Sequence, residues 1–208
     1  SSRDLGVGLA LLVKQTEGRQ GPGSAGAALR RRLRAARNRA LGRMKQALLD
    51  LDLATLRRDL RRILARGVAD PLMAMLRVRI MREEEGSALL AALASVGERF
   101  DPEALHALRS RARRLRYAAE LGAALMGSSP EAVKILKQAQ EILGEMHDAW
   151  VLGQWLEGQG DAARARGRVQ EAAEARRLRA ACEAISRDLH ARFLAWNPDT
   201  KLRWALAL

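Results

Sequence analysis

The sequence contains few aromatic residues, which make up only 3 % of its 208 positions. Strands favour aromatic and β-branched side chains, whereas the apolar residues here are mainly alanine and leucine, which suit helices. Cys182 is the single cysteine, so an internal disulfide framework is excluded and a reducing compartment is expected. No apolar run approaches the ~20 residues of a membrane helix, and the first residues show no signal-peptide pattern. We therefore expect an all-helical protein in the cytoplasm.

Positive charge is abundant. The chain has 37 lysines and arginines against 24 acidic residues, which gives a formal net charge of +13, and 48 % of its residues are apolar. Such a chain can bury a core and still attract anions over a range that salt controls. Arginine greatly outnumbers lysine, and its planar fork suits bidentate binding of phosphate. A merely basic protein with an arginine-rich codon usage is the plain alternative.

Helical periodicity dominates the chain, and turn-forming residues divide it. Asp70-Pro71, Asp101-Pro102 and Ser129-Pro130 each place a capping side chain before a proline at the first helical position. Glycines mark further boundaries. The predicted helices cover residues 3–16, 25–49, 52–66, 71–84, 86–98, 102–126, 130–145, 147–158, 161–195 and 199–206.

The sequence also contains an internal repeat. Asp4, Val7 and Leu12 match Asp148, Val151 and Leu156 at an offset of 144, and the hexapeptide at 31–36 recurs at 176–181 at an offset of 145. The same order and nearly the same offset favour a duplicated helical unit. We expect one bundle of two pseudo-symmetric halves, 1–98 and 99–208. The counterpart of 102–145 would fall before residue 1, so the first half is expected to be incomplete.

The helix predicted for 102–126 separates its apolar and basic side chains. At 100° per residue, the predicted core face comprises Leu105, Leu108, Ala112, Leu115 and Ala119. Beside it lies a basic ridge about 80° wide, formed by His106, Arg109, Arg113 and Arg116. Arg111 and Arg114 point elsewhere, and Glu120 is the only acid in the ridge. A solvated charged face is the ordinary alternative, but unpaired like charges destabilise a helix unless an anion offsets them.

A second predicted helix, at 25–49, repeats this arrangement. Its predicted core stripe comprises Leu29, Leu33, Ala36, Ala40, Met44 and Ala47. Along its margin run Arg30, Arg34, Arg37 and Lys45. Two such ridges side by side would form a groove of one sign, which would attract a linear anion. Weaker candidates for extending this groove are Lys134, Lys137, Arg176 and Arg179.

Two stretches of the chain carry a resemblance to a known family. Leu105-His106-Ala107-Leu108-Arg109, followed by Arg113-Arg114-Leu115-Arg116-Tyr117, resembles the signature helix of the CHAD family, the conserved histidine α-helical domains. Leu143-Gly144-Glu145-Met146-His147-Asp148 is similar to the second element of that family, and Arg3-Asp4-Leu5 is similar to the same element in the first half. The resemblance implies paired helical bundles whose basic surface binds inorganic polyphosphate. It makes candidate ligands of His106, Arg109, Arg113, Arg114, Arg116 and Tyr117.

The expected function is therefore non-catalytic binding of polyphosphate, with phosphate or sulfate ions as simpler ligands. We expect no membrane partner and no cofactor. Within the cytoplasm, the protein is expected to associate with polyphosphate granules. Nucleic acid is the second alternative, although one tyrosine and two phenylalanines leave little for base stacking. A helical scaffold is the third, since Trp150, Trp155, Trp196 and Trp204 could form an exposed patch, although tryptophans more often pack in cores.

Catalysis is not expected. The three histidines, His106, His147 and His190, lack metal-ligand spacing, and Cys182 has no base near it in the sequence. No glycine-rich phosphate loop is present. The acidic run at 83–85 could bind a divalent ion, but a solvated helix end before Gly86 is the simpler interpretation. The sequence therefore predicts a protein that is not an enzyme and holds no metal.

Overall fold

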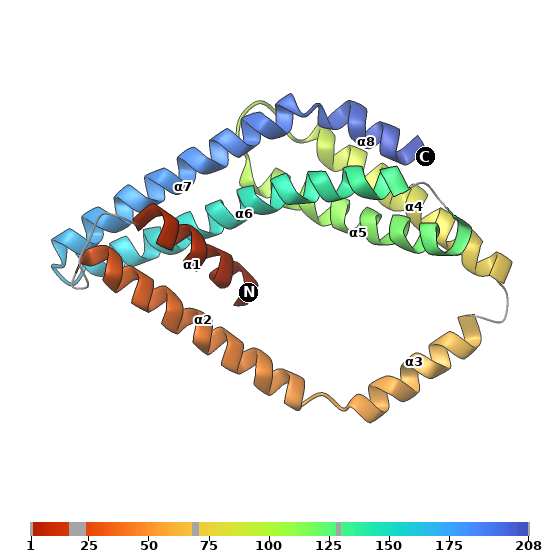
Figure 1. Ribbon diagram of the computed structural model, residues 1–208, viewed down its shortest axis with the longest axis horizontal. Helices are drawn as coiled ribbons and strands as arrows, with labels where there is room; N and C mark the ends of the chain where they lie inside the picture. Colours follow the sequence, from red (N-terminus) through yellow and green to blue (C-terminus); the bar gives the residue numbers. More distant parts are fainter. Residues whose placement is uncertain (1, 17–23, 68–70, 128–129, 208) are drawn as a thin grey trace. The chain divides into compact units, whose positions relative to one another are not determined.

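The computed structural model describes residues 2–16, 24–67, 71–127 and 130–207. These residues form eight α-helices and no strand (Figure 1). The helices are α1 (Ser2–Thr16), α2 (Ala25–Leu49), α3 (Leu53–Gly67), α4 (Pro71–Ala94), α5 (Pro102–Met126), α6 (Pro130–Arg164), α7 (Val169–Ala195) and α8 (Pro198–Ala207). The predicted all-α helical bundle is confirmed.

The chain divides into two compact units, each built from two stretches of sequence. Unit 1 comprises Ser1–Leu51 and Glu145–Leu189, and unit 2 comprises Asp52–Gly144 and His190–Leu208. These units are defined by packing, and their boundaries differ from those of the predicted halves 1–98 and 99–208. The two halves were inferred from the sequence repeat and stay a prediction. Helix α6 contributes to both units, since its residues up to Gly144 belong to unit 2 and the rest to unit 1.

The core of unit 1 contains two positions that both copies of the repeat supply. Its buried members are Leu12, Leu29, Leu33, Leu152, Leu156, Ala175, Leu178 and Cys182. Leu12 and Leu156 are one matched pair of the repeat, and Leu33 and Leu178 are another. Helix α1 packs on α2, and Gly8 lies close to both α2 and α6, because a Cβ atom there would be in ordinary contact with Leu33 at 3.9 Å and with Leu152 at 3.5 Å. The two segments of the predicted repeat thus contribute to one shared core.

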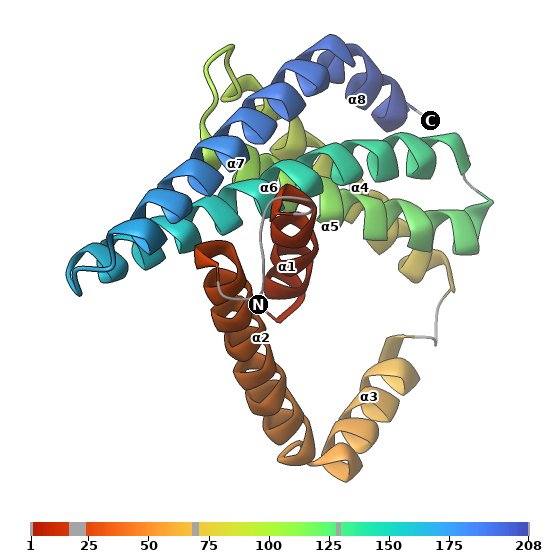
Figure 2. The same cartoon turned by 60° about the vertical axis from the view of Figure 1, so that its left-hand side comes forward.

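Unit 2 is built around α4 and α5, which lie side by side in both views (Figures 1 and 2). Helix α8 also packs on α4, close enough for a Cβ atom at Gly86 to lie 2.5 Å from a methyl carbon of Leu206. The buried side chains of this unit include Val78, Leu89, Leu105, Leu108, Leu115, Leu136, Leu143, Phe193 and Leu202.

Three predicted helix boundaries are wrong. Helix α4 continues through Gly86, and α6 runs unbroken through Gly144, Gly158 and Gly160. A glycine inside a helix costs only about 0.5–1 kcal/mol relative to alanine, and close packing can offset that cost. The chain instead breaks between α6 and α7 at Gly167, whose φ of 68° is left-handed. The left-handed backbone conformation of Gly167, rather than the mere presence of a glycine, therefore identifies the boundary between α6 and α7.

The predicted core stripe of α2 is correct only in its first half. Leu29 and Leu33 are buried, but Ala36 and Ala40 are half-buried, and Met44 and Ala47 are exposed. A helix of 25 residues is about 37 Å long at 1.5 Å per residue. Helix α2 therefore extends past the core of its own unit, and the apolar side chains near its end are left on the surface.

Candidate polyanion-binding surfaces

Helix α5 begins and ends where its sequence directs. Asp101 is its N-cap and accepts hydrogen bonds from the backbone N–H groups of Glu103 and Ala104 at 2.9 and 3.2 Å, with Pro102 in the first turn. Gly127 ends it in the left-handed conformation, with φ 69°. Asp101-Pro102 is thus the predicted cap. The other two predicted caps, at Asp70 and Ser129, lie outside the described residues.

The predicted core face of α5 is confirmed, and this fixes the direction of its arginines. All five of its members are at most 5 % exposed: Leu105, Leu108, Ala112, Leu115 and Ala119. The basic ridge predicted beside them lies at the boundary between core and solvent. His106 and Arg113 are exposed, whereas Arg109 and Arg116 are half-buried.

Arg116 is held by three neighbours. Its Nε donates to Oε1 of Gln140 on α6 at 2.7 Å, and its Nη1 donates to Oε1 of Glu120 at 2.5 Å. Its guanidinium carbon also lies 4.5 Å from the centre of the exposed Tyr117 ring. The same Glu120 lies 3.9 Å from Nζ of Lys137. Arg116 therefore ties α5 to α6, and two of its five N–H donors are engaged.

Arg109 and Arg113 differ from Arg116. Within the described part of the chain, neither has a hydrogen bond or an ion pair. Arg109 lies beside Gly144, where a Cβ atom would be 4.0 Å from its Nε. Gly144 thus leaves room beside the guanidinium that a larger side chain would fill. These two arginines keep their donors available for an anion.

The two remaining arginines of α5 face α4. Arg111 lies 3.4 Å and Arg114 3.7 Å from the carboxylate of the largely buried Glu85. Arg114, a candidate through the family resemblance, is still 61 % exposed at its side chain. Glu85 therefore neutralises part of the charge on this side of α5, whereas the ridge of Arg109 and Arg113 retains its charge.

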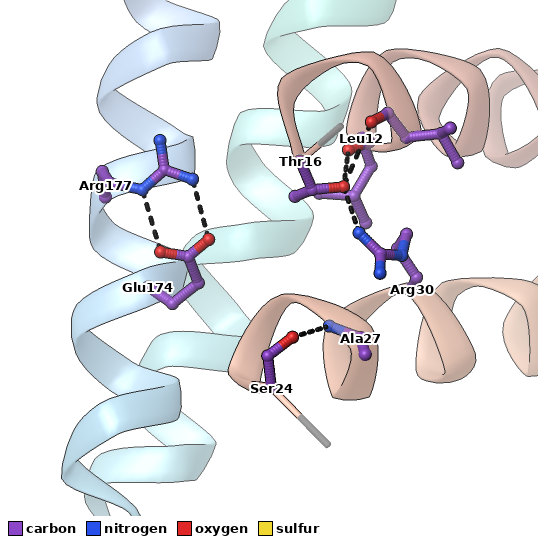
Figure 3. Close-up of polar contacts among 8 residues, drawn as sticks. Leu12, Thr16, Ser24, Ala27, Arg30, Glu174 and Arg177 are labelled. Atoms are coloured by element: carbon purple, nitrogen blue, oxygen red, sulfur yellow. Dashed lines mark hydrogen bonds and ion pairs between the residues drawn. The ribbon is translucent and has the colours of Figure 1, made fainter. Parts of the chain in front are cut away.

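In unit 1, some predicted candidates are engaged in contacts with other helices. Arg30 donates to Oγ1 of Thr16, which joins α2 to α1 (Figure 3). Arg179 on α7 contacts Glu157 on α6 at 2.5 Å and Glu183 at 2.9 Å. Of the neighbouring arginines that were not candidates, Arg32 contacts Glu171 on α7 at 2.5 Å, whereas Arg177 is bidentate to Glu174 within α7 (Figure 3).

The other candidates of unit 1 have unused donors. Among the residues that the structure describes, Arg34, Arg37, Lys45 and Arg176 have no polar partner. Arg37 is half-buried beside Gly6, whose Cβ atom would lie 3.5 Å from its Nε. Each unit therefore carries its own set of unpaired cations.

Of the two weaker candidates in unit 2, Lys134 contacts Glu131 at 3.7 Å and Lys137 contacts Glu120.

A family model described as the CHAD domain matches residues 1–157 of this chain. The chain belongs to the CHAD family. No curated protein matches the chain, and no solved structure does. The matched residues include all of α1 to α5 and α6 up to residue 157. The resemblance stated from residues 105–148 is thus confirmed at the level of the family.

Several residues that organise this CHAD site were not found from the sequence. Gln140 and Glu85 hold arginines of α5, but they lie 24 and 26 residues away, so only the packing of α4 and α6 brings them there. Glu120 is four residues after Arg116, a spacing that predicts an ion pair on a helix.

No group of three or more metal-ligating side chains occurs among the described residues of the CHAD chain. No described helix is long and apolar enough to cross a membrane.

Proposed function

We propose that this CHAD protein binds inorganic polyphosphate without transforming it, through a basic groove lined by arginine, lysine and histidine. The observation that carries the proposal is the difference among the arginines of α5. Arg111, Arg114 and Arg116 have acidic partners, while Arg109 and Arg113, at the margin of the buried stripe, have none within the described part of the chain. Membership of the CHAD family is consistent with a polyphosphate-related function.

The chemistry of the ligand suits these side chains. Polyphosphate presents about one negative charge per phosphate unit and no base edges, so recognition requires regularly placed donors rather than shaped pockets. An arginine can donate two parallel hydrogen bonds to one phosphate group. His106 is exposed one turn before Arg109 on the same ridge. Its imidazole would add a further donor, and a protonated imidazole would donate the stronger hydrogen bond.

The central experiment is a titration of the full chain with long-chain polyphosphate at two salt concentrations. Arg109→Ala with Arg113→Ala should weaken binding by at least about tenfold, because two charge-assisted contacts are lost. Each lost phosphate contact should also lower the slope of log affinity against log salt by about 0.7–0.9. A combined change in slope of about 1.5 is therefore expected.

The matched control is Arg58→Ala with Arg62→Ala on α3. It removes the same two charges from a helix outside the proposed site, where both arginines contact Asp59. This control should bind within about twofold of the wild type, since long-range attraction is screened by salt. Equal binding by the wild type and the Arg109/Arg113 variant would remove α5 from the site.

A nucleic-acid function would give a different result in competition. Single-stranded or duplex DNA, added at equal phosphate concentration, should fail to displace polyphosphate, because the chain has few aromatic side chains for stacking on bases. Efficient displacement would assign the basic surfaces to nucleic acid instead.

The absence of catalysis is the remaining part of the proposal. We expect no release of phosphate from polyphosphate when magnesium or manganese is added to the full chain. Turnover that scales with protein concentration, and that Arg109→Ala with Arg113→Ala lowers, would make the protein an enzyme. A cytoplasmic protein with the proposed activity would meet its ligand at polyphosphate granules.

A further inference from the structure

The margin of α5 beside α6 carries a row of charged side chains spaced three or four residues apart, so they lie along one side of the helix. This charged row consists of Arg109, Arg113, Arg116 and Glu120. Gly144 of α6 lies beside one end of it, next to Arg109, and Lys137 of α6 contacts Glu120 at the other end. All of these residues belong to unit 2. The charged row therefore follows the contact between two helices of one unit, and Glu120 is its single acid.

Glu120 occupies the position of a bound anion between two cations. Its Oε1 accepts a hydrogen bond from Nη1 of Arg116 at 2.5 Å and lies 3.9 Å from Nζ of Lys137. One carboxylate oxygen thus bridges basic groups from α5 and α6. Arginine and lysine bind a phosphate oxygen through the same kind of charge-assisted contact. The carboxylate of Glu120 therefore lies where these two cations would hold a phosphate group.

The charge of Glu120, rather than a lack of donors, opposes the binding of a phosphate at this position. Two of the five N–H donors of Arg116 are engaged, and the other three have no acceptor in the described part of the chain. The position is also open to solvent, since the side chains of Glu120 and Lys137 are 37 % and 56 % exposed. A phosphate that approached the free donors of Arg116 would meet the carboxylate at contact distance, where like charges repel most strongly.

The contact between α5 and α6 does not depend on the charge of Glu120. Nε of Arg116 donates to Gln140 of α6 at 2.7 Å, while the ion pair of Arg116 with Glu120 lies within α5. Glu85 is different, because it is only 19 % exposed and joins α4 to two arginines of α5. An exposed ion pair within one helix contributes little to stability. The negative charge of Glu120 can therefore be removed with little effect on the fold.

We propose that Glu120 limits polyphosphate binding on α5. It neutralises Arg116 and Lys137, so the bound phosphate chain extends along Arg109 and Arg113 and ends there. This inference rests on the proposed function and adds to it the residue that sets the affinity of the site. Removal of the carboxylate extends the binding surface by two cations, one from each helix.

The test is a titration of the full chain with long-chain polyphosphate at two salt concentrations, for the wild type and for Glu120→Gln. The amide keeps the shape of the side chain and an acceptor for Arg116, but it carries no charge. We expect binding to be at least about tenfold tighter, because two charge-assisted contacts are gained. The slope of log affinity against log salt should become steeper by about 1.5, at about 0.7–0.9 for each added phosphate contact.

The matched control is Glu141→Gln on α6. It removes the same charge from an exposed residue that has no ion pair in the described part of the chain. This control should bind polyphosphate within about threefold of the wild type, since a charge that contacts no cation of the site acts only through screened solvent.

Lys137→Ala separates competition by Glu120 from a general rise in positive charge. In the wild type it should weaken binding by no more than about twofold, since Glu120 already neutralises Lys137. In Glu120→Gln it should weaken binding by at least about fivefold, since the amine then binds phosphate. A general effect of charge would give the same factor in both backgrounds.

Equal affinity of the wild type and Glu120→Gln would overturn the inference and leave the proposed function in place, and so would an equal effect of Lys137→Ala in both backgrounds. Absence of polyphosphate binding by both proteins would overturn the proposed function itself. Glu120→Ala also removes the charge and should give the same gain as Glu120→Gln, with the thermal unfolding temperature of both variants unchanged in circular dichroism. A gain confined to one of the two variants would show that the charge of Glu120 is not the cause.

Discussion

The arginines of α5 differ in what their guanidinium groups already bind, and this decides what each substitution should do. Removing Arg116 breaks a contact between α5 and α6 and leaves Gln140 without its donor, so its first effect is on stability. Removing Arg109 or Arg113 breaks no polar contact within the described residues, so its first effect is on a ligand. Mutational data on this helix therefore need a stability measurement beside each affinity.

Cys182 offers a prediction that concerns a single residue. It lies in the core of unit 1, and burial raises the pKa of its thiol from about 9 to about 11. At pH 8 this lowers the thiolate fraction about a hundredfold, and only the thiolate reacts. We expect alkylation of the native chain to be at least about a hundredfold slower than that of the unfolded chain, as measured by mass spectrometry.

The raised pKa of Cys182 also predicts the direction of a pH effect. The unfolded thiol loses its proton near pH 9 and the folded thiol near pH 11, so stability should fall as pH rises through this window. Cys182→Ala should lack that part of the fall. Rapid alkylation of the folded chain at pH 8 would show that the thiol is not buried.

At the scale of the helix, two glycines should respond to the same substitution with opposite sign. Gly42 lies within α2 with nothing within 4 Å of a Cβ atom, so Gly42→Ala should stabilise the protein by about 0.5–1 kcal/mol. Gly127 ends α5 at φ 69°, where an L-residue is strained, so Gly127→Ala should destabilise it by about 1 kcal/mol. Urea denaturation measures both.

Each glycine variant serves as the control for the other, because both add one methyl group. A loss of stability in Gly42→Ala would indicate that α2 is packed where the structure leaves it open. No loss in Gly127→Ala would indicate that α5 ends in another conformation.

Helices were predictable from the sequence where local signals and packing agree. Helices α2 and α5 have their predicted bounds, since Ser24 and Asp101 cap them and leucines recur at helical spacing along them. The interiors of α4 and α6 were wrongly divided before Gly86, at residue 146 and after Gly158, because local sequence signals do not reveal whether neighbouring helices hold the backbone straight. The true break at Gly167 depends on a left-handed φ that no residue type guarantees.

The candidate site was predictable to the extent that it belongs to one helix. Angular spacing identified the core face of α5 and therefore the ridge of Arg109 and Arg113. The same reasoning could not rank the arginines, because the partners that engage Arg111, Arg114 and Arg116 include Glu85 and Gln140 on other helices. In α2 it also overestimated the core, since helical periodicity gives a direction but not the length over which a neighbour is present.

For the whole molecule, α6 predicts how the two units unfold. Its first part contributes Leu136 and Leu143 to unit 2, and its second part contributes Leu152 and Leu156 to unit 1. Melting of either unit removes packing from a helix that the other requires, so thermal unfolding should show one transition. Glu145→Pro interrupts the helix at the boundary of the units, at a cost of about 3 kcal/mol, and should split or broaden that transition.

The control for this experiment is Glu131→Pro, which places proline in the first turn of α6, where it is tolerated. It should leave a single transition near the wild-type temperature, followed by circular dichroism. A single sharp transition in Glu145→Pro would mean that the continuity of α6 does not couple the units.

The shared core of unit 1 has an evolutionary consequence. Two copies that meet in one core, each supplying the same two leucine positions, have the symmetry of a homodimer whose chains have been joined. In a symmetric homodimer both copies carry the same residue at each position, whereas the two halves of a fused chain can carry different residues at equivalent positions. Leu29 is a buried core residue, whereas its counterpart Glu174 is in an ion pair with Arg177. Under the predicted duplication, one ancestral surface would have evolved into two different ones.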